Sequence, residues 1–133
     1  MNMKPALQYS LLCLGYDETK GSPIFQFVVH HLPLGPFPYE FPEDAGIFLV
    51  NGFIGVSETL RPRFRLLDPE GTVMMEQSLE IQPHEPGVAG PMLSVAFLTG
   101  LRFAHSGEYW IEVWLDEERL TRYPLWVEEL EVA

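Results

Sequence analysis

The sequence is poor in cysteine and in long apolar runs, and each shortage excludes a class of protein. Cys13 is the only cysteine among the 133 residues, so no intramolecular disulfide can form. Its apolar neighbours predict a small buried side chain. No uninterrupted apolar run approaches the roughly 20 residues that span a bilayer. These features are typical of a soluble protein of a reducing compartment, and we expect a cytoplasmic location.

Basic residues are also scarce. Lysine and arginine number 8 against 19 for aspartate and glutamate, which gives a formal net charge of -11. A field of that sign repels phosphate backbones and anionic lipid. We therefore expect neither nucleic acid nor a membrane as a partner.

Helical periodicity is the third shortage. No segment of about eleven residues or more carries an apolar stripe at i, i+3, i+4 and i+7, whereas short apolar runs recur between glycine, proline and aspartate. The length suffices for one core without disulfides or metal, and a hydrophobic content of 47% excludes disorder. The sequence predicts one all-β domain over residues 1–133. We expect a two-sheet antiparallel sandwich of seven to eight strands, immunoglobulin-like in architecture.

The expected strands lie between the turn signals. They are 7–14, 24–32, 46–56, 60–67, 72–81, 92–103 and both arms of a hairpin over 106–127. The proline-rich stretch 33–44 should cross the surface or bridge the sheets, because proline lacks the amide hydrogen of a ladder. The stretch 46–56 is apolar on both faces, which indicates a central strand whose outer side is covered. Lys4 and the apolar run to Cys13 resemble a lipoprotein signal, but Leu12 precedes the cysteine where cleavage needs a small residue. We expect the first strand there.

The stretch Asp68-Pro69-Glu70-Gly71 has the pattern of a type I turn and predicts a hairpin. The expected inward pairs are Phe64 with Met75 and Leu66 with Val73. Arg61, Arg63 and Arg65 then lie outside, with Arg63 opposite Glu76. The simplest interpretation of these arginines is pairing with Glu76 and Glu80 on a solvated face, and the alternative is a site for an acidic ligand. In the strand 92–103, one parity holds Leu93, Val95, Phe97, Leu101 and Phe103.

All three tryptophans fall on one side of the C-terminal hairpin. Tyr109, Ile111, Val113 and Leu115 alternate with Glu108, Trp110, Glu112, Trp114 and Asp116, which predicts a half-buried strand. A turn at 117–119 places Tyr123, Leu125 and Val127 opposite Val113, Ile111 and Tyr109. On the other side Trp126 then meets Trp110, and Arg122 meets Trp114 within cation–π reach.

The candidate site is therefore an outer face made of Trp110, Glu112, Trp114, Arg122 and Trp126. Three clustered indoles exceed the apolar patch that a soluble monomer normally exposes, so we expect a cover. One candidate is the chain itself, through residues 1–6 or the proline-rich connection with Phe37 and Phe41. Another is a second copy or an unidentified protein, because Trp, Tyr and Arg dominate interfaces. A third is a carbohydrate held between indole rings and carboxylates.

Signatures of catalysis and of metal binding are weak. The four histidines, His30, His31, His84 and His105, do not have zinc-site spacing. The sequence shows neither a phosphate-binding glycine loop nor a nucleophile elbow. We expect a non-catalytic protein with no metal or cofactor, acting as an interaction or self-associating module, with carbohydrate binding as the alternative.

Three stretches resemble a family of small bacterial proteins described only as a domain of unknown function. They are 37–41 (FPYEF), 63–71 (RFRLLDPEG) and the hairpin from Gly107-Glu108-Tyr109 through Asp116 to Pro124-Leu125-Trp126-Val127. The resemblance implies a β-sandwich with no assigned activity. The family pattern has glycine after the aspartate of the last turn, whereas Glu117 follows Asp116 here. Ser106-Gly107-Glu108-Tyr109 also resembles a tyrosine corner, whose hydroxyl bonds back to the main chain.

Overall fold

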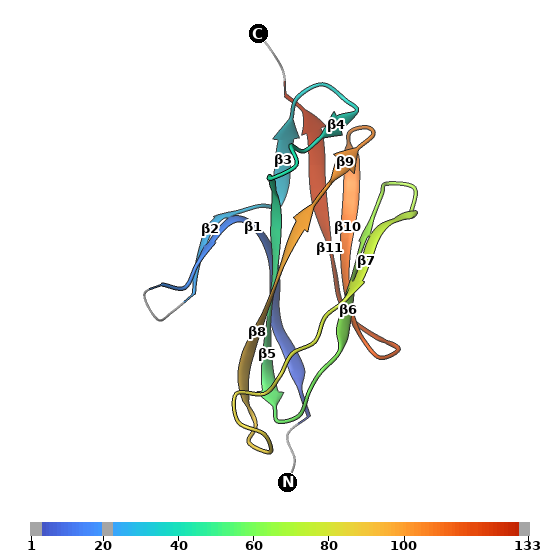
Figure 1. Ribbon diagram of the computed structural model, residues 1–133. Coiled ribbons are helices and arrows are strands. Elements are labelled where there is room, and N and C mark those ends of the chain that lie inside the picture. Colours follow the sequence, from blue (N-terminus) through green and yellow to red (C-terminus); the bar gives the residue numbers. More distant parts are fainter. Residues whose placement is uncertain (1–3, 20–22, 131–133) are drawn as a thin grey trace.

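The computed structural model describes residues 4–19 and 23–130, and every regular element in this part of the chain is a β-strand (Figure 1). The all-β prediction is confirmed. The strands are β1 (Ala6–Asp17), β2 (Ile24–Val28), β3 (His31–Leu34), β4 (Tyr39–Glu40), β5 (Gly46–Val56), β6 (Pro62–Leu67), β7 (Val73–Ser78), β8 (Gly90–Thr99), β9 (Arg102–Phe103), β10 (Gly107–Leu115) and β11 (Glu118–Glu129). No helix in these residues could cross a bilayer.

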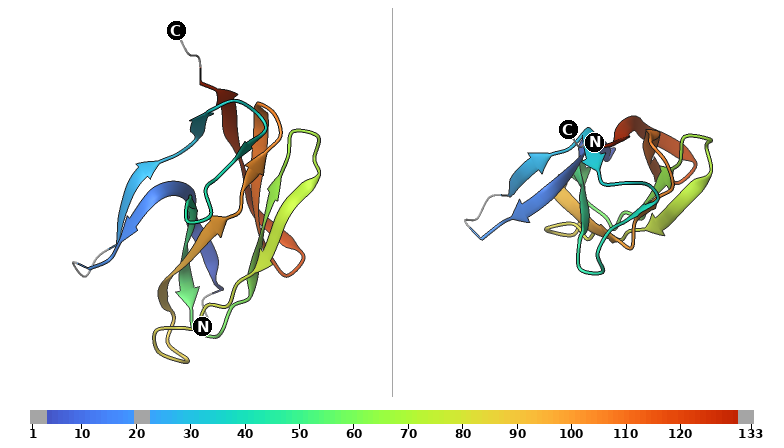
Figure 2. Two further views of the ribbon diagram at one scale, coloured as in Figure 1. Left: turned by 45° about the horizontal axis from the view of Figure 1, so that its top comes forward. Right: turned by 90° about the horizontal axis from the view of Figure 1, so that it is seen from above.

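Two main sheets face each other, as the two turned views show (Figure 2). One has the order β2-β1-β5-β8 and the other the order β3-β11-β10-β6-β7, while β4 and β9 form a short third ladder. The antiparallel prediction is wrong at one pair, because β3 and β11 run parallel. The described residues form eleven strands where seven to eight were expected. One extra strand arises because the segment expected as 24–32 divides into β2 and β3, which join different sheets.

The core lies between the two main sheets. Leu12, Leu49 and Leu98 enter it from the four-stranded sheet, and Phe64 and Ile111 enter it from the five-stranded sheet. The proline-rich segment runs from β3 in one sheet to β5 in the other, which confirms the predicted bridge. Its aromatic residues Phe37, Tyr39 and Phe41 pack against the core.

Aromatic side chains of β1 cover part of the outer side of β5. The ring of Tyr16 lies 6.3 Å from that of Phe48, and the ring of Tyr9 fills the space beside Gly52, which has no side chain. Val50, which pairs with Leu11 on β1 and with Val95 on β8, is fully buried. The expected cover for this central strand is therefore supplied by the chain itself.

The parity predicted for 92–103 changes at Gly100. Leu101 and Phe103 are buried in the core, but Ala96 and Leu98 accompany them in place of Val95 and Phe97, which are 36% and 44% exposed. Gly100 has a φ of 67°, a left-handed conformation that bends the chain between β8 and β9. Because of this bend, even-numbered residues of β8 face the core before Gly100, and odd-numbered residues face it after Gly100.

The hairpin of β6 and β7 forms with a register two residues away from the prediction. Leu66 pairs with Met75 and Phe64 pairs with Gln77. A two-residue shift retains the face on which a side chain lies, so Phe64 and Leu66 are buried as expected. The predicted inward position of Val73 is wrong, because an irregularity after Leu66 pairs Val73 with Leu67 and leaves Val73 42% exposed. Arg65, rather than Arg63, therefore pairs with Glu76.

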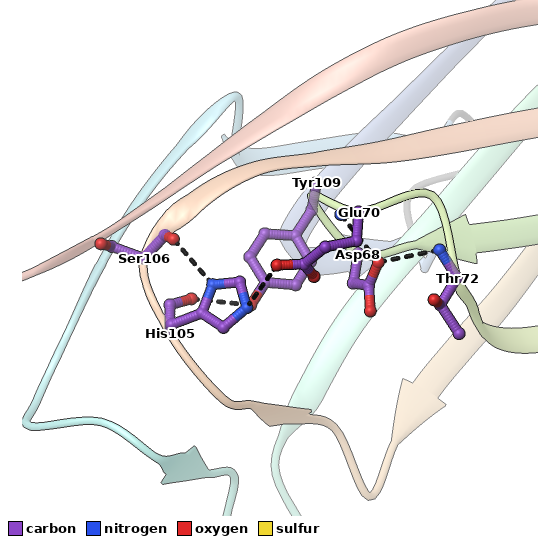
Figure 3. Close-up of polar contacts among 6 residues, drawn as sticks. All are labelled: Asp68, Glu70, Thr72, His105, Ser106 and Tyr109. Atoms are coloured by element: carbon purple, nitrogen blue, oxygen red, sulfur yellow. Dashed lines mark hydrogen bonds and ion pairs between the residues drawn. The ribbon is translucent and has the colours of Figure 1, made fainter.

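The start of β10 forms the predicted tyrosine corner (Figure 3). The hydroxyl of Tyr109 donates to the carbonyl oxygen of His105 at 2.7 Å. The imidazole Nδ1 of His105 lies 3.0 Å from the carbonyl oxygen of Ser106, and this contact raises the histidine pKa above its ordinary value of 6.5. In the β6–β7 turn, Oδ1 of Asp68 accepts a hydrogen bond from the backbone amide of Thr72 and fixes the turn. The two turns lie side by side at one end of the five-stranded sheet.

Candidate functional site

The hairpin that carries the tryptophans turns earlier than the sequence indicates. Asp116 and Glu117 form the turn, and Leu115 pairs with Glu118, so the predicted turn at 117–119 is wrong. Asp116 has a φ of 55°, a conformation that aspartate tolerates better than bulky residues. Because the turn has only two residues, the return strand begins at Glu118, earlier than predicted.

The earlier turn shifts the cross-strand pairs by two residues. Tyr109 pairs with Leu125, and Ile111 pairs with Tyr123. The predicted contacts of Trp126 with Trp110 and of Arg122 with Trp114 are therefore wrong: Trp126 lies opposite Glu108, and Arg122 lies opposite Glu112. Because the shift is even, the faces remain as predicted. The tryptophans occupy the outer side of the five-stranded sheet.

Trp110 lies beneath an arginine of the return strand. The guanidinium carbon of Arg122 is 3.9 Å from the centroid of the indole, within the range of a cation–π contact. Pro124 is the cross-strand partner of Trp110 on β11. Trp110 is consequently only partly exposed.

Trp114 is covered by two arginines from β6, the other neighbour of β10. The guanidinium carbons of Arg63 and Arg65 lie 5.0 and 5.6 Å from its ring centroid. Arg63 is the direct cross-strand partner of Trp114, and its Nη1 lies 3.5 Å from the carbonyl oxygen of Asp116. Two guanidinium groups of β6 therefore lie near the indole, which is partly buried.

Glu112 lies at the centre of the arrangement and is only 6% exposed, although it is on the outer face. Its Oε1 accepts a hydrogen bond of 3.0 Å from the indole Nε1 of Trp114. Its Oε2 lies 3.5 Å from both Arg119 Nη1 and Arg122 Nε. One carboxylate thus links a tryptophan to two arginines and fixes the positions of all three.

Trp126 stands apart at the β3 side of the sheet. It is 51% exposed, which makes it the most open of the three indoles. Its partner in the parallel ladder is His31, whose Nε2 lies 2.7 Å from Oε1 of Glu128. We call the whole surface the Trp–Arg face. Its members are Arg63, Arg65, Trp110, Glu112, Trp114, Arg119, Arg122 and Trp126.

Three members of this face, Arg63, Arg65 and Arg119, were not assigned to it from the sequence. The alternation of arginines on β6 was visible, but only the sheet order places β6 beside β10. The expected pairing of these arginines with acids holds in part: Arg65 Nε lies 2.7 Å from Glu76 Oε2. Arg61, which precedes β6, has its Nε 3.7 Å from Oε2 of Glu80.

Positive charge is in excess at the centre of the Trp–Arg face. Four of the eight basic residues of the chain gather there, and the carboxylates that contact them are those of Glu112 and Glu76. Such a concentration in a chain of net charge -11 is a local reversal of the overall field. Half of the basic residues of the chain therefore lie around two indoles on one side of the five-stranded sheet.

Neither of the two segments expected to cover this face is seen across it in the described residues. Residues 1–3 lie outside the described part, so their proposed place across the tryptophans is not defined. Lys4 Nζ lies 3.9 Å from Glu118 at the hairpin turn, and Phe37 and Phe41 pack into the core. The cover that is observed over Trp110 and Trp114 consists of arginine guanidinium groups. Within 4–19 and 23–130, no group of three histidine, cysteine or acidic side chains is arranged to hold a metal ion.

Comparison with known proteins places the chain in a family. The model of a family of unknown function, DUF6941, matches residues 8–128. The chain belongs to this family. The match covers nearly the whole sequence and confirms the resemblance seen in its turn and strand motifs. No curated protein matches the chain significantly. Membership of DUF6941 gives the chain's relationship but assigns it no activity.

Proposed function

We propose that this DUF6941 protein is a non-catalytic protein-interaction module whose Trp–Arg face binds a partner segment rich in carboxylates. The observation that carries the proposal is the excess of arginine around half-buried indoles in an otherwise acidic chain. Tryptophan and arginine are the residues that most often dominate binding energy at interfaces. Electrostatic complementarity would bring an acidic partner to this side of the molecule.

The fixed geometry of the arginines supports the same proposal. Arg122 rests on Trp110 and contacts Glu112, while Arg65 rests near Trp114 and contacts Glu76. Side chains already held in place lose less conformational entropy when a partner binds. A planar guanidinium also offers paired donors to an incoming carboxylate. Trp126, more open than the other two, would provide the apolar contact.

Carbohydrate binding is the alternative, and the geometry supports it less. Sugar rings stack on open aromatic faces, whereas guanidinium groups lie over Trp110 and Trp114. Trp126 is one exposed indole with a carboxylate nearby. A sugar would therefore have a single platform.

The setting of the proposed module is also part of the proposal. We infer a single domain of the immunoglobulin-like sandwich type, cytoplasmic and of bacterial origin. The tyrosine corner at Tyr109 and the core shared by the two main sheets support the architecture. A lone buried cysteine, Cys13, supports a reducing compartment.

Tryptophan fluorescence tests the proposal directly, because the binding surface contains all three indoles. Titration with poly-L-glutamate at about 50 mM salt should change the emission, and the change should fade at about 500 mM salt. Arg122→Ala should weaken the response, whereas Arg102→Ala, an exposed arginine of β9, should not. Maltohexaose provides the carbohydrate arm. A response to the sugar and none to polyglutamate would overturn the proposal.

A further inference from the structure

The four-stranded sheet is almost free of charge, in contrast to the rest of the molecule. Of all the residues in β1, β2, β5 and β8, only Asp17 is charged, and it lies at the end of β1. The chain as a whole is 20% charged. Several of its most exposed large apolar side chains belong to this sheet. They are Leu14, Ile24, Phe27, Val28, Ile54, Val95 and Phe97.

The edges of the two main sheets differ in how they are protected. Proteins guard edge strands with charge, proline, distortion or short length, because an unprotected edge pairs with other chains. β7 carries Glu76, β3 has four residues including Pro33, and β2 has five residues with Phe27 at a φ of 56°. Each of these three edge strands therefore has a feature that hinders pairing with another chain.

β8 is the edge strand without such protection. It is 10 residues long, has no charged residue, and has its single proline, Pro91, at the second position. Its outward side chains Val95 and Phe97 are 36% and 44% exposed, and the Phe97 ring lies 4.5 Å from that of Phe48. A long apolar edge with a partly open aromatic face beside it is suited to strand addition.

We propose that β8 pairs antiparallel with β8 of a second copy, which joins the two four-stranded sheets across a twofold axis. The absence of charge on β8 allows a second copy to be the occupant. Two molecules of net charge -11 repel each other wherever acidic surfaces meet, and β8 offers a contact without charge on either side. In a twofold contact the same strand serves both partners, so residues near the middle of β8 lie opposite their own counterparts.

The size of this contact sets its strength. At about 3.4 Å per residue and about 10 Å of sheet thickness, β8 offers a strip of roughly 350 Å² per partner. Stable interfaces bury about 800 Å² per partner, so the contact is that of a reversible dimer. The dimer forms and dissociates with protein concentration.

Analytical ultracentrifugation over about 10 to 500 µM tests the proposal, because a weak interface dissociates on dilution. The wild type should pass from monomer to dimer in this range. Val95→Lys should raise the dissociation constant by about tenfold or more, since two added charges meet at the axis. Val73→Lys is the matched control: the same residue type, 42% exposed, on the edge strand β7. Circular dichroism establishes that both variants are folded.

A cysteine at the centre of β8 provides a second, independent measurement. Side chains directly opposite in an antiparallel pair have Cβ atoms about 4.5–5.5 Å apart, close enough for a disulfide after small adjustments. Val95→Cys should form a covalent dimer on mild oxidation, and Val73→Cys should not. A wild type that stays monomeric at the highest concentration would overturn the proposal. A dimer weakened equally by both lysine variants, or weakened only by Trp126→Lys, would also overturn it.

Discussion

At the scale of single residues, Glu112 has the most unusual environment on the Trp–Arg face. It is a carboxylate on the outer side of a sheet, yet it is buried by the indole and guanidinium groups that it binds. A buried carboxylate is stable only when charged or hydrogen-bonded partners replace its water. Trp114, Arg119 and Arg122 supply those partners. Glu112 therefore holds the side chains of Trp114, Arg119 and Arg122 in place on the Trp–Arg face.

Substitution of this carboxylate measures how strongly it holds the surface. Glu112→Gln retains the shape but removes the charge that faces two arginines. We expect the free energy of unfolding, measured by urea denaturation, to fall by about 1–2 kcal/mol, because the arginines are partly screened by solvent. The exposed Glu118→Gln should change stability by less than about 0.5 kcal/mol. Equal stability of the two variants would contradict the role assigned to Glu112.

At the scale of elements, the tyrosine corner ties β10 to the loop before it. The Tyr109 ring is buried against Phe103, with centroids 4.9 Å apart, and its hydroxyl reaches the carbonyl oxygen of His105. Burial raises the pKa of the Tyr109 hydroxyl, which therefore donates its proton throughout the neutral range. The corner sets where β10 begins.

Removal of one oxygen tests the corner. Tyr109→Phe retains the buried ring and leaves the His105 carbonyl oxygen without this donor. We expect a loss of about 1–2 kcal/mol in the free energy of unfolding. Tyr39→Phe, a partly buried tyrosine of β4, is the control and should cost less. A smaller loss for Tyr109→Phe than for the control would show that the hydroxyl bond contributes little.

The sequence predicts the faces of several strands but not their register. Alternation alone correctly assigned the faces of β6, β10 and β11, because an error of two residues in register leaves each side chain on its face. It could not give the register itself. That depended on a turn at Asp116, where φ is positive without a glycine to reveal it. A local bend at Gly100 likewise could not be predicted, and because of it the core residues of β8 have the opposite parity to the one expected.

The membership of the site was only partly predictable for a different reason. The three tryptophans, Glu112 and Arg122 share one hairpin, so local pattern was sufficient to group them. Arg63 and Arg65 come from β6, and their contact with Trp114 depends on the sheet order. Long-range order of this kind is encoded in core packing rather than in any local motif. The arginines were therefore interpreted as solvated pairs, whereas two of them cover an indole.

At the scale of the whole molecule, the two sheets present opposite kinds of surface. The five-stranded sheet gathers arginine and tryptophan, and the four-stranded sheet is apolar and nearly uncharged. Figure 2 shows the two sheets on opposite sides of the shared core. A dimer through β8 would leave both Trp–Arg faces open to solvent. Each dimer would then present two equal faces to acidic partners.

Affinity capture from cells that express the protein tests the central claim most directly. The bait is the full chain, compared with the double variant Arg122→Ala/Trp126→Ser and with the matched control Arg102→Ala. Wild type and control should retain the same protein, this protein should present an acidic segment, and about 500 mM salt should release it. The double variant should lose it while remaining folded. Retention of that protein by the double variant, at either salt concentration, would contradict the account.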